Sequence, residues 1–131
     1  MQIPSPALYL RGTMIIHVDG STTKTCAVYN HKFTKIFPLP FVVTGNQGEY
    51  WAVINALLYC KGWIDRDIKV YADSELIVRQ LNDRYKIKNQ KLITLHKMVK
   101  KLERSFDSVS YHWIPREENE AGIMLERKSK S

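Results

Sequence analysis

The sequence predicts a mixed α/β protein in which several helices pack on one sheet. Alternating apolar residues are typical of strands, and apolar residues three or four positions apart are typical of helices; both patterns occur in this chain. In order, the chain shows three strands, a helix, a strand, two helices, a strand and a final helix. The three opening strands predict an antiparallel start, and the later alternation with helices predicts a mixed sheet.

The first predicted strand covers residues 14–19 and ends in a carboxylate. Ile16 and Val18 share one face of this strand, whereas His17 and Asp19 share the other. A carboxylate at the end of a strand lies at the rim of the sheet, where it can help to hold a metal ion. We interpret His17 as a packed, hydrogen-bonded side chain and not as a ligand, because it lies in mid-strand.

The remaining elements follow from the same two patterns. We expect strands over residues 25–30, 33–41, 68–72 and 109–114, and helices over residues 49–59, 74–81, 92–102 and 117–127. Pro38 and Pro40 place the third strand at an edge of the sheet, because proline cannot donate a hydrogen bond to a neighbouring strand. Asn46 is the expected N-cap of the first long helix.

Composition and charge are typical of a single globular domain. The chain has 131 residues, 44% of them hydrophobic, and a formal net charge of +7. We place the domain at residues 14–127, after an extension (1–13) that we expect to be dispensable and before a basic tail (128–131). The positive charge favours an anionic partner, and nucleic acid is a better candidate than a membrane surface. A charge that serves only solubility is the alternative.

Cysteine content bears on the redox compartment, and hydropathy bears on membrane spans. Cys26 and Cys60 form neither a disulfide framework nor a metal-ligand spacing, so we expect a cytoplasmic protein. No apolar run approaches the roughly 18 residues that a membrane-spanning helix needs. We therefore expect no membrane partner. We also expect the protein to be a monomer.

Three carboxylates occupy positions that suit a divalent-metal site. Asp19 ends the first strand, Glu49 opens the first long helix, and Asp73 ends the fourth strand. Mg²⁺ takes oxygen ligands and retains water, and two such ions can activate water and stabilise the leaving oxygen of a phosphodiester. Two alternatives are local: Glu49 could complete a capping box with Asn46, and Asp73 could belong to ordinary helix-start chemistry.

Several motifs in matching order resemble ribonuclease HI, above all its short archaeal- and plant-like branch. They are D-G-S at 19–21, T-G-N-Q-G-E-Y at 44–50, Y-A-D-S at 71–74, Y-K-I-K-N at 85–89 and W-I-P-R-E-E-N at 113–119. The resemblance implies the RNase H fold, a five-stranded sheet with helices on both faces, and cleavage of the RNA strand of RNA/DNA hybrids. It also implies that Asp19, Glu49 and Asp73 are catalytic and bind two Mg²⁺ ions, or Mn²⁺ in their place. The last motif argues against another nuclease or a recombinase on the same fold.

One position departs from the pattern of this family. The family carries a fourth active-site aspartate after N-x-A in the last helix, but here Asn119-Glu120-Ala121 is followed by Gly122. Glu118 and Glu126 lie one helical turn on either side and are candidate substitute ligands. The alternative function is therefore a catalytically impaired or inactive RNase H-like domain that binds hybrid or double-stranded nucleic acid.

The resemblance also implies contacts to the nucleic acid. The candidates for binding the substrate are Gly20, Ser21, Asn46, Gln47, Lys88 and Asn89. The lysines and arginine of residues 86–104 form either a solvated face or a surface beside the substrate groove. Trp113 alternates with Val109 and Tyr111, so we expect it in the core and not on a stacking platform.

Overall fold

The computed structural model describes residues 13–21, 25–41, 43–63 and 66–130, without the side chains of residues 128–130. The predicted extension (1–13), apart from Thr13, lies outside the described residues. The same holds for the last residue of the predicted tail (128–131), whereas residues 128–130 continue the final helix.

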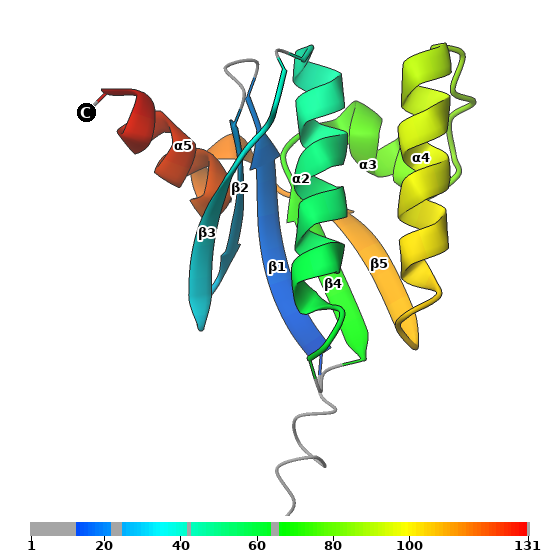
Figure 1. Ribbon diagram of the computed structural model, residues 1–131, viewed down its shortest axis with the longest axis horizontal. Helices are drawn as coiled ribbons and strands as arrows, with labels where there is room; N and C mark the ends of the chain where they lie inside the picture. Colours follow the sequence, from blue (N-terminus) through cyan, green and yellow to red (C-terminus); the bar gives the residue numbers. More distant parts are fainter. Residues whose placement is uncertain (1–12, 22–24, 42, 64–65, 131) are drawn as a thin grey trace, which may run out of the picture.

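One five-stranded sheet forms the centre of the molecule, with the strand order β3-β2-β1-β4-β5 (Figure 1). The strands are β1 (Thr13–Gly20), β2 (Thr25–Asn30), β3 (Phe33–Pro38), β4 (Asp67–Ala72) and β5 (Ser108–Trp113). β1 pairs antiparallel with β2, and β2 with β3, whereas β1–β4 and β4–β5 are parallel. The predicted mixed sheet is confirmed, and so is the edge position of β3.

Helices cover both faces of the sheet. The helices are α2 (Gly45–Cys60), α3 (Glu75–Leu81), α4 (Gln90–Glu103) and α5 (Glu120–Lys130), with a short 3-10 turn, η1 (Arg116–Glu118), before α5. α2 packs on β1 and β2 and against α4, while α5 packs on the opposite face of β1 and β2 (Figure 1). None of the helices in the described part of the chain is both long and apolar enough to cross a membrane.

The two faces of β1 divide its side chains as the alternation predicts. Ile16 and Val18 are fully buried in the main core beneath α2. His17 faces α5, where its ring stacks on Tyr71 at 5.7 Å and its Nδ1 accepts a hydrogen bond from the backbone N–H of Glu120. His17 is thus a packed, hydrogen-bonded side chain, as predicted. Asp19 lies on this same face, at the rim.

Several predicted boundaries and caps differ from the structure. β3 ends at Pro38, three residues before the predicted end, because neither Pro38 nor Pro40 can donate to a ladder. The final helix starts at Glu120 and not at 117, because the backbone of Asn119 is extended and separates η1 from α5. Asn119 Oδ1 accepts hydrogen bonds from the backbone N–H groups of Ala121 and Gly122 at the start of this helix. The N-cap of α2 is Thr44 and not Asn46.

The prediction that Trp113 belongs to the core is wrong. Trp113 is 50% exposed, although it shares the alternation of Tyr111, which is buried. Trp113 is the last residue of β5, and β5 is an edge strand, so no element covers its outer end. Its indole N–H instead donates to the backbone carbonyl of Asp73 at 3.1 Å.

Candidate metal centre

Three elements bring the predicted carboxylates together. β1 and β4 are parallel neighbours, so Asp19 at the end of one and Asp73 just after the other lie at the same rim of the sheet. The start of α2 supplies Glu49 from the face of the sheet that α2 covers. Each of the three residues offers an oxygen atom that lies within 4.8 Å of the other two. We call Asp19, Glu49 and Asp73 together the carboxylate cluster.

A close backbone contact sets the position of Glu49. A Cβ atom on Gly20 would lie 2.0 Å from the carbonyl carbon of Gly48, far inside any real contact. A Cβ atom on Gly48 would similarly lie 2.9 Å from the backbone oxygen of Ser21. Only glycine at both positions lets the end of β1 touch the first turns of α2. Gly20 directly follows Asp19, and Gly48 directly precedes Glu49. The contact between the two glycines therefore brings Glu49 close to Asp19.

The capping of α2 leaves Glu49 available for chemistry. Thr44 Oγ1 accepts a hydrogen bond from the backbone N–H of Gln47, and Gln47 Oε1 accepts one from that of Thr44. This reciprocal capping box occupies Gln47, so the local alternative, in which Glu49 caps the helix with Asn46, is wrong.

Two oxygens of the cluster are buried without a hydrogen-bond partner among the described residues: Asp19 Oδ1 and Glu49 Oε1. Burial raises the pKa of Glu49 well above its usual value, and the neighbouring Asp19 and Asp73 raise it further. Burial, and then the charge of Asp73, raises the pKa of Asp19 as well, although hydrogen bonding with Glu49 and, to a smaller extent, the charge of Arg116 oppose the shift. Buried carboxylate oxygens are normally satisfied. Oxygen ligands that face one another without a donor fit a divalent cation such as Mg²⁺.

Asp73 is held in place from the segment that follows β5. Asn119 Nδ2 donates to Asp73 Oδ2 at 2.8 Å and also to the backbone oxygen of Val18 at 3.0 Å, so one amide joins the ends of both strands. Arg116 Nη1 lies 3.8 Å from Asp73 Oδ1, and its side chain is 65% exposed. The sequence does not reveal Asn119 and Arg116 as individual contributors, because their contact with the cluster requires the folded chain.

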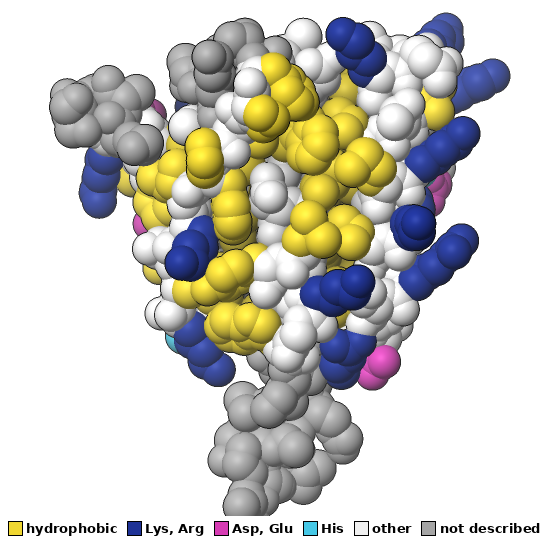
Figure 2. Space-filling view, viewed as in Figure 1, with side chains coloured by type: hydrophobic (Ala, Val, Ile, Leu, Met, Phe, Trp, Pro, Cys, Tyr) yellow, Lys and Arg dark blue, Asp and Glu magenta, His cyan; other side chains and the backbone are white. Residues whose placement is uncertain are grey.

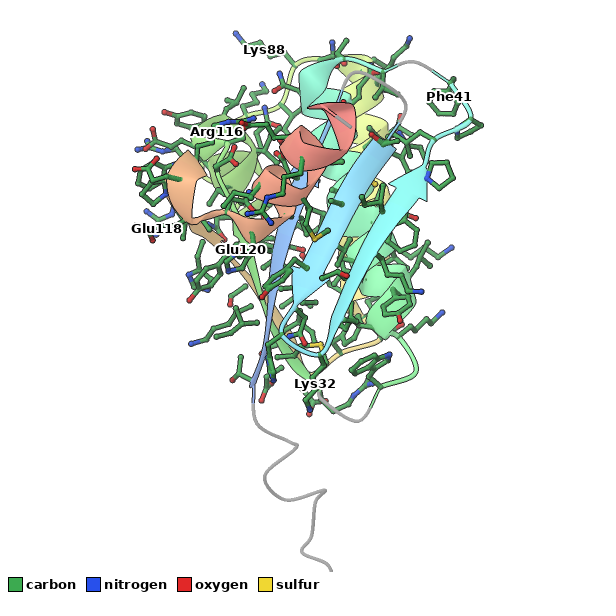
Figure 3. The ribbon with its side chains drawn as sticks, turned by 90° about the vertical axis from the view of Figure 1, so that its left-hand side faces the viewer. Lys32, Phe41, Lys88, Arg116, Glu118 and Glu120 are labelled. Carbon is green, nitrogen blue, oxygen red and sulfur yellow. The ribbon has the colours of Figure 1, made fainter. Side chains whose placement is uncertain are left out.

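Gly122 faces the carboxylate cluster directly. A Cβ atom at this position would lie 3.2 Å from Asp19 Oδ2 and 3.6 Å from Asp73 Oδ2. A longer side chain here would therefore project among the carboxylates. The two candidate substitutes do not join them: Glu118 and Glu126 are exposed, and neither belongs to the cluster found among the described residues. Glu118 lies at the outer edge of the molecule in Figure 3.

The predicted substrate-binding residues fall into three groups. Gly20, Ser21 and Asn46 lie at or near the rim that carries the cluster. Gln47 and Asn89 have side chains engaged in capping, since Asn89 Oδ1 accepts from the N–H of Leu92 at the start of α4. Lys88 is exposed and extends outward in Figure 3.

The basic residues of α4 lie mainly along one side of the molecule (Figure 2). Lys91, Lys97 and Lys101 are exposed there. Lys100 differs, because its Nζ donates to the backbone oxygen of Leu81 at 2.8 Å and pairs with Asp83 at 3.2 Å. Lys100 therefore connects α4 to the end of α3 and is not part of a freely solvated face.

Comparison of the sequence with known proteins identifies a family. The sequence model of the reverse transcriptase-like family matches residues 36–128. The bifunctional protein Rv2228c of Mycobacterium tuberculosis (strain H37Rv) is 32% identical over 76 residues, which make up 58% of this chain. The matched part is 21% of the length of that protein, so the chain corresponds to a small part of this relative.

Solved structures match the fold over almost its whole length. RNase H1 from the halophilic archaeon Halobacterium salinarum NRC-1 superimposes with a TM-score of 0.77 at 23% identity, over 92% of this chain and all of that one. LC11-RNase H1, solved in complex with an RNA/DNA hybrid, gives a TM-score of 0.72 at 25% identity, over 90% of this chain and 99% of that one. The chain therefore belongs to the reverse transcriptase-like family and has the fold of the ribonucleases H1.

Proposed function

We propose that this protein is a metal-dependent endonuclease that hydrolyses the RNA strand of RNA/DNA hybrids, leaving 5′-phosphate and 3′-hydroxyl ends. The observation that carries the proposal is the carboxylate cluster, with two buried oxygens that find no hydrogen-bond partner in the described part of the chain. The fold supports it, since a protein of the same fold, LC11-RNase H1, has been solved with a hybrid. We further propose that the protein acts as a monomer.

Asp19, Glu49 and Asp73 would hold the cation, either Mg²⁺ or Mn²⁺. When bound, such a cation supplies positive charge that stabilises the phosphodiester transition state and lowers the pKa of the attacking water. The residues around it have distinct tasks. Asn119 fixes the orientation of Asp73, and the contact between Gly20 and Gly48 holds Glu49 against the end of β1.

The rim around the cluster suits the RNA strand of a hybrid. The minor groove of a hybrid is wide and shallow and exposes 2′-hydroxyl groups. Gly20, Ser21 and Asn46 present short polar groups and backbone at that rim, which is the chemistry that reads a hydroxyl. Arg116 adds an exposed guanidinium 3.8 Å from Asp73, where it can meet a phosphate oxygen of the same strand.

Gly122 favours a second candidate function, hybrid binding without cleavage. No carboxylate among the described residues joins Asp19, Glu49 and Asp73 in the cluster, and the position that faces it carries a hydrogen atom. A cluster with fewer ligands holds its cations more weakly. Such a domain would retain the rim and the basic surface while losing hydrolysis.

A cleavage assay on an end-labelled hybrid separates the two candidates. We expect RNA-strand cleavage with Mn²⁺ and weaker cleavage with Mg²⁺, 5′-phosphate products, and a loss of about 10³-fold or more in Asp19→Asn. Single-stranded DNA and duplex DNA of the same sequence serve as controls. If the wild-type chain binds the hybrid but leaves it intact with both cations, the enzymatic proposal fails and the binding function stands.

A further inference from the structure

A hollow lies between α3 and the outer end of β5. Its volume is about 420 Å³, within the range of roughly 300–1,000 Å³ typical of small-ligand sites. Trp113, Arg79, Arg84 and His112 are among its lining residues. The indole N–H of Trp113 donates to the backbone carbonyl of Asp73, so one lining residue of the hollow is bonded to the backbone of a residue of the carboxylate cluster.

Two aromatic rings are exposed in and beside this hollow. Trp113 is 50% exposed, and Tyr85 is 46% exposed. The guanidinium of Arg79 lies 5.2 Å from the centre of the Tyr85 ring, donates to its hydroxyl at 3.0 Å and pairs with Glu75 at 2.7 Å. These contacts link Glu75, Arg79 and Tyr85 at the surface of the protein. An indole left half in water offers a flat apolar face to a planar ligand.

The charge of the hollow is positive on balance. Arg79 is paired with Glu75, but Arg84 is exposed and shows no side-chain ion pair within the part of the chain that the structure describes. His112 is half-buried, and its Nε2 lies 2.8 Å from Ser110 Oγ. The hollow therefore combines the exposed guanidinium of Arg84, which suits a phosphate, with an indole face, which suits a base.

We propose that this hollow binds an unpaired nucleotide of the RNA strand, just beyond the strand's contact with Asp73. The base must be unpaired, because stacking inside a duplex covers both of its faces. We assign the nucleotide to the strand that is cut, because Trp113 donates to the backbone carbonyl of Asp73, whose side chain belongs to the carboxylate cluster. The preferred substrate is then a hybrid that continues into single-stranded RNA. This inference rests on the proposed function and names its substrate class.

Binding measurements in EDTA test the inference without hydrolysis. The probes are a blunt RNA/DNA hybrid, the same duplex with a single-stranded RNA extension at either end, and the same duplex with DNA extensions. We expect one RNA extension to tighten binding about tenfold, the size of one base stacked on an aromatic side chain, and to quench tryptophan fluorescence. Trp113→Phe should remove most of that quenching.

Two charge-matched variants separate the hollow from general electrostatics. Arg84→Gln should abolish the advantage of the RNA extension, whereas Arg104→Gln, which removes an exposed arginine at the end of α4, should preserve it. Equal affinity for blunt and extended hybrids would overturn the inference. So would a preference for DNA extensions, or an advantage that both variants lose equally. The proposed function fails independently, through absence of cleavage of the blunt hybrid with either cation.

Discussion

At the scale of single residues, the carboxylate cluster lowers the stability of the metal-free protein while it supplies the proposed cation ligands. Asp19 and Glu49 are almost fully buried, and each carries an oxygen that has no hydrogen-bond partner among the residues the structure describes. A buried, unsatisfied polar group costs about 1–3 kcal/mol, and more when it is charged. The protein tolerates this cost where a cation would remove it. The cluster should therefore weaken the metal-free fold.

We predict that Glu49→Gln stabilises the metal-free protein at neutral pH by about 1–3 kcal/mol, because an amide can donate to Asp19 and carries no charge. The pKa of Glu49 is raised in the folded state, so the native protein binds more protons than the unfolded chain. Wild-type stability should consequently fall as the pH rises from the ordinary carboxyl range through this raised value. The fall should be smaller in Glu49→Gln.

Chemical denaturation in EDTA across this pH range measures the effect. Glu118→Gln, which changes an exposed carboxylate outside the cluster, is the matched control and should follow the wild type. Glu49→Gln stability that is equal to or below that of the wild type at neutral pH would show that burial of Glu49 is not unfavourable.

At the scale of elements, the close approach of α2 to β1 depends on Gly20 and Gly48, each of which has a hydrogen atom in place of a side chain. Gly20→Ala should destabilise the protein by about 1–3 kcal/mol and lower its metal affinity, because the added methyl group overlaps Gly48 and displaces Glu49 from Asp19. Gly45→Ala is the control, since a Cβ atom there meets nothing within 4 Å. Denaturation and a Mn²⁺ titration by thermal shift report both properties. Equal behaviour of the two variants would refute the role of this contact.

The link between α4 and α3 gives a second prediction at this scale. Lys100→Met should cost about 1–2 kcal/mol of stability, because Lys100 Nζ donates to Leu81 and pairs with Asp83. Lys97→Met removes the same charge from an exposed position and should leave stability nearly unchanged. Urea denaturation compares the two. If both variants are equally stable, Lys100 contributes no more than a surface charge.

Local patterns predicted which elements form better than where they begin. Alternation in β1 identified a strand, because side-chain direction depends only on neighbours in sequence. The N-cap of α2 was misplaced by two residues, since Thr44, Asn46 and Gln47 all suit helix termini and only the folded backbone shows which pair is reciprocal. The turn at Asn119 also escaped prediction, because its amide acts on residues far away in the chain.

At the scale of the whole molecule, the parallel pairing of β1 and β4 makes the site. Three carboxylates that are far apart in sequence converge because two strand ends and one helix start meet at a single rim. The motifs predicted this convergence in advance. They did not reveal the exposure of Trp113, which depends on β5 being the edge strand with no neighbour beyond it. Nor could they show that Glu118 and Glu126 lie outside the cluster.

Cleavage of an RNA/DNA hybrid by Gly122→Asp tests the central claim most directly. In the absence of cation the added carboxylate should destabilise the protein, because its Cβ lies 3.2 Å from Asp19 Oδ2. With cation, it should lower the Mg²⁺ concentration required for half-maximal cleavage by about tenfold or more. Gly122→Asn has nearly the same shape without the charge, so it should show neither gain. Unchanged Mg²⁺ dependence in Gly122→Asp, or an equal gain in Gly122→Asn, would contradict a cation centre built by Asp19, Glu49 and Asp73.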